Sequence, residues 1–205
     1  KNKILVLATA DQHIHCYPDM TNTNNKFEYK SPLGSYQTRC ISIFNDVQGF
    51  ALGSVEGRVA IEYFSSLPNK PKLHSQQTKN SVPENKNDFV FKCHRDNTDI
   101  YSVNAIDFHC TNKFLTAGSD GQIVWWDKDK RNRVAIRDFF KRKNINDENS
   151  VPTPIVSAKF SPNGTTMFYA ATYDWSKGAD YAPKVQQNLI LAHNIDPAEI
   201  ATKKT

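Results

Sequence analysis

The stretch that decides the fold is KFLTAGSDGQIVWWD, residues Lys113–Asp127. Two runs rich in apolar and aromatic residues, Lys113–Gly118 and Gln122–Asp127, flank a tight polar turn at Ser119–Gly121. Apolar residues that alternate with a period of two on either side of such a turn are typical of antiparallel β-strands. The run Val103–His109 has the same pattern, so we expect it to be a third strand of this unit.

The same order of strands and turns recurs along the chain. Cys40–Phe64 repeats the pattern of Tyr101–Asp127, and Ile155–His193 contains a third copy. The opening segment, Ile4–Tyr17, resembles the tail of a fourth. Repeats at a fixed period indicate a repeat architecture, in which each unit buries its apolar face against its neighbours.

The repeat length identifies the architecture. The spacing from Gly53 to Gly118, less a polar insertion of about 25 residues, is about 40 residues, the length of a four-stranded propeller blade. That insertion, Ser65–Asp88, has almost no large apolar residues, and we expect a mobile loop there. We therefore predict an all-β fold, a β-propeller of about three and a half blades. The expected blades are roughly residues 1–36, 37–92, 93–152 and 153–205.

Composition favours a soluble globular protein. Hydrophobic residues make up 39% of the 205 residues, and no apolar run approaches the roughly 20 residues needed to cross a bilayer. We therefore expect no membrane insertion. Lys and Arg number 26 against 21 for Asp and Glu, a mild basic excess that permits a nucleic-acid partner without requiring one.

The residue types that carry enzymatic or metal chemistry do not form a recognisable motif. We find no nucleophile elbow, phosphate-binding loop or zinc-protease helix, so no catalytic residue and no cofactor is expected. His13 and His15 alternate on a predicted strand without a third ligand, which argues against a metal site. The four cysteines are far apart and are expected to be buried, reduced thiols of a nuclear or cytosolic protein: Cys16, Cys40, Cys93 and Cys110.

One segment resembles a WD repeat. In such repeats a His, an Asp in the tight turn and a Trp are linked with a Ser or Thr by hydrogen bonds that join the strands of one blade. Three of these roles fall to His94, Asp120 and Trp126. Ala117 stands where the hydroxyl is usual, so Thr116 or Ser119 would have to supply it.

Longer phrases resemble the messenger-RNA export factors of the WD-repeat family, over nearly the whole chain. The phrases are Gln37–Cys40, Gly49–Ile61, Phe91–Arg95, Ile100–Asn104 and Tyr173–Gly178. The spindle-checkpoint propeller shares most of them and is the alternative. It differs at Tyr173–Gly178, which favours the export factors.

The resemblance implies a non-enzymatic adaptor of the nuclear pore that shuttles to the cytoplasm. Its expected partners are a Phe-Gly-repeat nucleoporin segment and single-stranded RNA, whereas the alternative would bind kinase or kinetochore segments of checkpoint and spindle proteins. Family members have seven blades. We therefore expect this chain to correspond to a C-terminal half, with the N-terminal half missing.

The resemblance also implies a side groove that binds nucleic acid or short peptides. The matching positions are Arg58, Phe91, Trp126, Asp127, Arg131 and Arg133. Aromatic faces flanked by guanidinium groups suit single-stranded RNA, because bases stack on rings and phosphates pair with arginines. The alternative is structural: Trp126 and Phe91 belong to the blade, and Lys128–Arg133 is a solvated strand end.

Two further segments carry weaker signals. Phe139 and Phe140 are flanked in a predicted long loop by the basic residues Arg137, Lys141, Arg142 and Lys143. This is either a solvated loop, the reading we favour, or an extension of an electrostatic RNA track. Asp174, Trp175 and Lys177 form either a partner-binding tip or a loop packed on its own blade.

Overall fold

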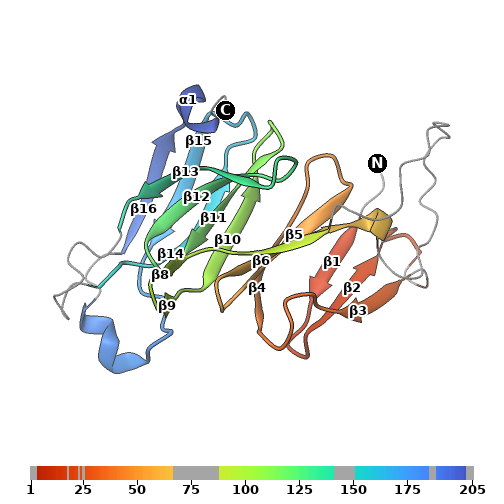
Figure 1. Cartoon of the computed structure of the whole chain (residues 1–205), viewed down its shortest axis with the longest axis horizontal. Helices are drawn as coiled ribbons and strands as arrows, with labels where there is room; N and C mark the ends of the chain where they lie inside the picture. Colours follow the sequence, from red (N-terminus) through yellow and green to blue (C-terminus); the bar gives the residue numbers. More distant parts are fainter. Residues whose placement is uncertain are drawn as a thin grey trace.

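The computed structural model describes residues 4–17, 19–22, 24, 26–66, 88–140, 151–184 and 188–201. Four antiparallel sheets follow one another in chain order across the molecule, from the N-terminal strands in red to the C-terminal strands in blue (Figure 1). Each sheet is built from consecutive strands, as short turns between alternating apolar runs require. The predicted all-β fold is therefore confirmed.

The first and second sheets are formed by residues before position 93. The first sheet consists of β1 (Leu5–Ala8), β2 (His13–Tyr17) and β3 (Phe27–Lys30). The second consists of β4 (Thr38–Ile43), β5 (Gly49–Ser54), β6 (Arg58–Tyr63) and β7 (Phe89–Lys92), with a 3₁₀ turn at Phe64–Ser66 after β6. Most of the predicted mobile insertion, residues 67–87, lies outside the described residues.

The third and fourth sheets follow a short hairpin of β8 (Arg95–Asp96) and β9 (Asp99–Ile100). The third consists of β10 (Val103–Phe108), β11 (Lys113–Gly118), β12 (Gln122–Asp127) and β13 (Asn132–Asp138). The fourth consists of β14 (Ile155–Phe160), β15 (Thr166–Ala171) and β16 (Leu189–Asn194). A 3₁₀ segment, η2 (Ala179–Lys184), and a four-residue helix, α1 (Pro197–Ile200), complete the chain. Neither is long and apolar enough to span a membrane, nor is any other described helix.

Neighbouring sheets pack face to face through apolar layers. The first strand of the third sheet, β10, contacts the first strands of its neighbours, β4 and β14. Phe44 after β4 meets Phe108 of β10 with ring centroids 4.9 Å apart, inside a layer shared by the second and third sheets. Further layers join the first sheet to the second around Ile14 and Phe50, and the third to the fourth around Met167. First strands side by side and sheets fanned around them are the arrangement of propeller blades.

One buried carboxyl group lies between the first and second sheets. Glu62 of β6 is 7% exposed, and its surroundings include Tyr29 of β3 and Cys16 of β2. Burial, and the nearby Asp88 carboxylate, raise the pKa of Glu62 to about 7. The side chain therefore changes charge near neutral pH inside an interface between blades.

Three details differ from the sequence predictions. Arg137 lies in β13 rather than in a long loop, because the run Val134–Ile136 continues the edge of the third sheet. Cys110 is exposed in the turn between β10 and β11, although all four thiols are free as expected. The opening hairpin is completed to a sheet of three strands by β3.

Candidate functional site

A hydrogen-bond chain crosses the third sheet at the predicted WD-repeat positions. His94 Nδ1 lies 2.9 Å from Asp120 Oδ1, and His94 Nε2 lies 2.8 Å from Thr116 Oγ1. Trp126 Nε1 donates to the same hydroxyl at 2.9 Å. The carboxylate of Asp120 can only accept, so His94 donates to it from Nδ1. The hydroxyl comes from Thr116 and not from Ser119, whose Oγ instead bonds Asp174.

This Asp–His–Thr order has the connectivity of a catalytic triad, but its burial excludes that use. Thr116 is 0% exposed, and its oxygen already accepts the indole proton of Trp126. A nucleophile must reach a substrate, which this hydroxyl cannot do. The chain of bonds therefore joins strands and fixes the ring of Trp126.

An aromatic pocket of about 150 Å³ opens beside that ring, between β7 of the second sheet and the β12–β13 hairpin of the third. Its aromatic walls are Phe89, Phe91, Phe114 and Trp126, and Lys92, Asp127, Arg131 and Asn132 complete the lining. The Phe91 and Trp126 centroids are 4.5 Å apart, with their planes inclined at 52°. Such rings offer a flat apolar surface of about the size of a nucleobase or an aliphatic side chain.

A second, more polar cavity of about 330 Å³ adjoins the first. The two share Lys92 and Trp126, and the second adds the cationic side chains of Arg95 and Arg133. Arg95 donates from Nη2 to the Glu56 carbonyl oxygen at 2.8 Å, which fixes its direction. Lys92 and Arg133 are exposed. We call the two cavities together the side groove.

The predicted groove residues do not all line the side groove. Phe91, Trp126, Asp127 and Arg131 line its aromatic pocket, and Arg133 lines its polar cavity. Arg58 lines neither, and its Nε instead contacts Glu56 Oε2 at 3.0 Å. Arg58 is paired with Lys92 across β6 and β7, but its contact with Glu56 holds the guanidinium outside both linings.

Two of these residues are committed to local structure. Asp127 Oδ1 accepts from the backbone N–H groups of Asp129 and Lys130, at 3.1 and 3.0 Å, and so shapes the β12–β13 turn. Arg131 in that turn has a φ of 52°, and its guanidinium lies 4.8 Å from the centroid of Phe89. The turn thus holds a cation against the aromatic wall.

The sequence pattern did not predict several residues that line the side groove. Phe89, Phe114, Lys92 and Arg95 were not singled out, although the alternation in Phe89-Val90-Phe91-Lys92 places both phenylalanines on one face. That alternation was the available signal.

The basic cluster after β13 is only partly described. Arg137 Nη2 lies 2.6 Å from Glu199 Oε1 of α1, so this residue joins β13 to the C-terminal helix. Lys141, Arg142 and Lys143 lie outside the described residues. Their contribution to an RNA track stays a prediction.

The predicted partner loop is fixed at its base and exposed at its tip. Asp174 bonds Ser119 and Ser176, and Lys177 Nζ lies 4.7 Å from the Tyr181 ring centroid. Trp175 is 65% exposed, although its ring contacts Tyr173 at 5.3 Å.

Within the described residues, no three His, Cys, Asp or Glu side chains are placed to hold a metal ion. His13 Nδ1 and His15 Nδ1 each contact a carboxylate at 3.2 Å, from Asp11 and Glu28 respectively. Both contacts join side chains of β2 to nearby carboxylates of the first blade.

Comparison with known proteins agrees with the fold and the hydrogen-bond chain. The family model "WD domain, G-beta repeat" matches residues 85–127, which include His94, Asp120 and Trp126. A solved structure titled "Crystal Structure of Mitotic Checkpoint Complex" matches 83% of this chain and 42% of its own, with a TM-score of 0.54 and 16% identity, a likeness of fold alone. The chain is a WD-repeat protein with a β-propeller fold.

Sequence relatives narrow the class. The chain is 38% identical to "Protein RAE1" of Arabidopsis thaliana over 99% of its own length and 51% of the relative's. It is 36% identical to "mRNA export factor GLE2" of Chaetomium thermophilum, covering 100% of this chain and 52% of that one. It is also 38% identical to "mRNA export factor" of Danio rerio, covering 92% and 47%. The chain is thus a homologue of messenger-RNA export factors and spans about half of their length.

Proposed function

We propose that this chain is part of a non-enzymatic adaptor that acts in messenger-RNA export at the nuclear pore. In this role it binds single-stranded RNA in the side groove and a segment of a Phe-Gly-repeat nucleoporin elsewhere on its surface. The names of its relatives support the export role. The RNA interaction rests on the chemistry of the groove.

The observation that carries the RNA proposal is an aromatic pocket that adjoins a cationic cavity. A base stacks on the rings of Phe91 and Trp126, and the Thr116 hydroxyl holds the Trp126 ring in place. The flanking phosphates pair with Lys92 and Arg133. Stacking contributes about 1–3 kcal/mol per base and tolerates any sequence, so the groove binds single strands with little base preference.

Duplex RNA should bind more weakly in the same groove. Its bases are paired and stacked on each other, so they present no free face to Phe91 or Trp126. We therefore expect a single-stranded oligonucleotide to bind more tightly than a hairpin stem of equal charge.

The experiment is a fluorescence-anisotropy titration of labelled oligouridylate with the protein and two variants. Arg133→Glu should weaken binding about tenfold, which corresponds to about 1.4 kcal/mol for one lost charge-assisted contact. Lys30→Glu makes the same change of charge on an exposed residue of the first sheet and should leave the affinity within twofold. Equal losses in the two variants would mean that net charge alone, and not the groove, attracts RNA.

The nucleoporin and the location are tested separately. A pull-down from nuclear extract, followed by mass spectrometry, should recover a Phe-Gly-repeat nucleoporin if the adaptor acts at the pore. Recovery of checkpoint kinases or kinetochore proteins alone would favour the alternative, a spindle-checkpoint propeller, and would contradict the export role.

A further inference from the structure

The loop Tyr173–Gly178 presents an exposed tryptophan on a rigid support. Trp175 is 65% exposed. Its φ of 59° is a left-handed backbone conformation that residues other than glycine rarely adopt. Such a conformation persists only where the surrounding contacts hold it. Those contacts come from Asp174 and Tyr173, the two residues that precede Trp175 in the chain.

Asp174, the residue before Trp175, connects the loop to the third sheet. Its carboxylate accepts from the Ser176 N–H at 3.1 Å, the Ser176 hydroxyl at 2.7 Å and the Ser119 hydroxyl. Ser119 in turn accepts from Asn104 Nδ2 of β10 at 3.0 Å, and the same amide donates to the Ile155 carbonyl at 3.1 Å. The loop is therefore connected to the first strands of two blades.

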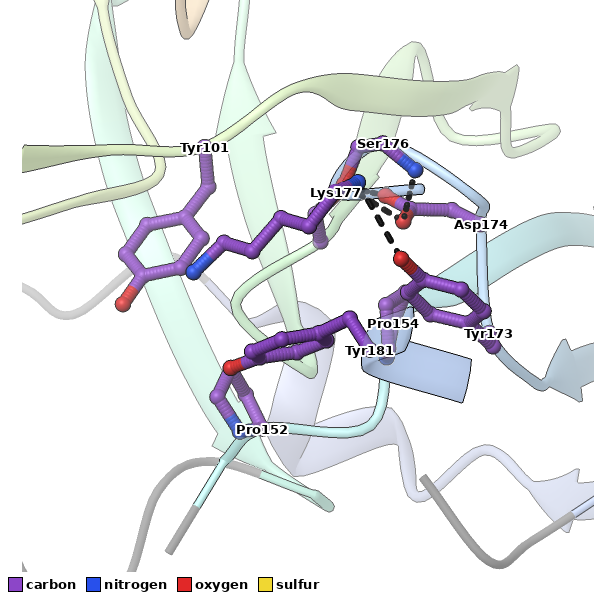
Figure 2. A pocket seen from close by; sticks show the side chains of 9 residues that line it. Tyr101, Pro152, Pro154, Tyr173, Asp174, Ser176, Lys177 and Tyr181 are labelled. Carbon is purple, nitrogen blue, oxygen red and sulfur yellow. Dashed lines mark hydrogen bonds between the residues drawn. The ribbon is translucent and has the colours of Figure 1, made fainter. Parts of the chain in front are cut away.

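Tyr173, the residue before Asp174, closes the loop on itself. Its buried hydroxyl donates to the Gly178 carbonyl at 2.8 Å and accepts from the Lys177 N–H at 3.1 Å. The Gly178 N–H donates to the Trp175 carbonyl at 3.2 Å. Figure 2 shows Tyr173 and Asp174 bonded to the residues that follow them. An exposed aromatic ring that is already ordered loses little entropy on binding, as in the hot spots of protein interfaces.

A hollow adjoins the loop. Ser176 and Lys177 line a polar cavity of about 350 Å³ together with the β8–β9 hairpin, where Ile100 is 44% exposed. The side chain of Lys177 extends between the rings of Tyr101 and Tyr181 (Figure 2). An exposed tryptophan next in sequence to the residues that line such a hollow, with an exposed Ile100 in the lining, suits the binding of an extended peptide.

The charges around the hollow favour a peptide over RNA. Lys177 is the one cationic residue among the described residues that line it, and no described carboxylate forms an ion pair with its ammonium group. Asp99 lies on the same rim and would repel a run of phosphates. A peptide avoids this cost because it can place a single carboxylate at Lys177.

We propose that Trp175 and Lys177 form the docking site for a short peptide segment that carries an apolar side chain close to a carboxylate. The inference rests on the proposed adaptor function and gives its protein partner a place separate from the side groove. The apolar side chain packs on the Trp175 ring, and the carboxylate pairs with the Lys177 ammonium group.

The test begins with a phage-displayed library of random 12-residue peptides, selected on the immobilised protein. Synthetic copies of the enriched peptides are then titrated against the protein and its variants by fluorescence polarisation. The enriched peptides should contain Asp or Glu within a few positions of a large apolar residue. Trp175→Ala should weaken their binding about 30-fold, as expected for an interface hot spot. Lys177→Gln should weaken it about threefold, with less dependence on salt.

The matched control is Phe168→Ala, which removes an exposed aromatic ring from β15, the strand that precedes the loop, and should leave peptide affinity unchanged. Peptides that bind Trp175→Ala as tightly as the parent, or that lack acidic residues, would overturn the proposal, as would displacement of the peptide by oligouridylate. Arg133→Glu separates this inference from the RNA proposal, because it should weaken oligouridylate binding and leave peptide binding intact.

Discussion

Replacing Glu62 by Gln should stabilise the protein at alkaline pH and not at acidic pH. Glu62 is almost completely buried between the first and second sheets, and burial, with Asp88 nearby, raises its pKa from the ordinary 4.5 to about 7. Between these two values the folded protein keeps the proton that the unfolded chain has lost. The contribution of the protonated carboxyl is therefore fully present below pH 4.5 and is lost as the pH rises through 7.

The magnitude follows from the two pKa values. The two pKa values differ by about 2.5, and at about 1.4 kcal/mol for each pKa unit this corresponds to about 3.5 kcal/mol. Because Glu62 keeps 7% of its surface exposed to solvent, which screens part of its charge, we expect about 2 kcal/mol. Glu62→Gln keeps the shape of the protonated side chain and removes this dependence.

The assay is urea denaturation of the parent and Glu62→Gln at pH 5 and pH 8.5, with Asp180→Asn, which replaces an exposed carboxylate on η2, as the control. The free energy of unfolding of Glu62→Gln minus that of the parent should rise by about 2 kcal/mol between the two pH values. Titrating groups that do not interact with Glu62 cancel in this difference. A difference that stays constant with pH, or that changes equally in Asp180→Asn, would refute the reasoning.

Two further substitutions test the bonds that join strands and sheets. Thr116→Val removes the hydroxyl shared by an indole and an imidazole nitrogen and should lower the free energy of unfolding by about 2–4 kcal/mol. The hydroxyl of Thr166 makes one long contact of 3.4 Å, so Thr166→Val should cost less than about 0.5 kcal/mol. Thermal denaturation of both variants measures the two losses. Glu199→Gln replaces by a neutral amide the carboxylate that contacts Arg137 of β13 and His193 of β16. Burial opposes ionisation of Glu199, but these hydrogen bonds outweigh it and lower its pKa. The loss should be about 1 kcal/mol at pH 7 and should vanish as the pH falls below the ordinary pKa; an unchanged loss at pH 3 would contradict this.

The repeat pattern was sufficient to predict the sheets because each depends on local alternation. Lys113–Gly118 and Gln122–Asp127 form β11 and β12 with the predicted bounds. The strand at Asn132–Asp138 was missed, since its charged ends concealed the apolar run Val134–Ile136. An edge strand is stabilised by pairing with its neighbour as well as by burial, and pairing leaves little trace in hydrophobicity.

The groove was harder to predict because it joins two blades. Trp126 and Phe91 could be suggested from resemblance, but their contact depends on how the second and third sheets pack. The same packing excludes Arg58 from the lining and brings in Lys92. Glu62 gave no signal at all in the sequence, because its perturbed pKa arises from residues distant in the chain.

The most direct test of the RNA groove is photo-crosslinking to single-stranded RNA that contains 4-thiouridine, with the linked peptides identified by mass spectrometry. The reagent attaches to residues in contact with the base. Stacking in the aromatic pocket predicts crosslinks to Phe91 or Trp126, and their loss in Arg133→Glu at limiting RNA. Crosslinks confined to the first or fourth sheet, with none in Phe89–Lys92 or Gln122–Asp127, would contradict the groove as the RNA site.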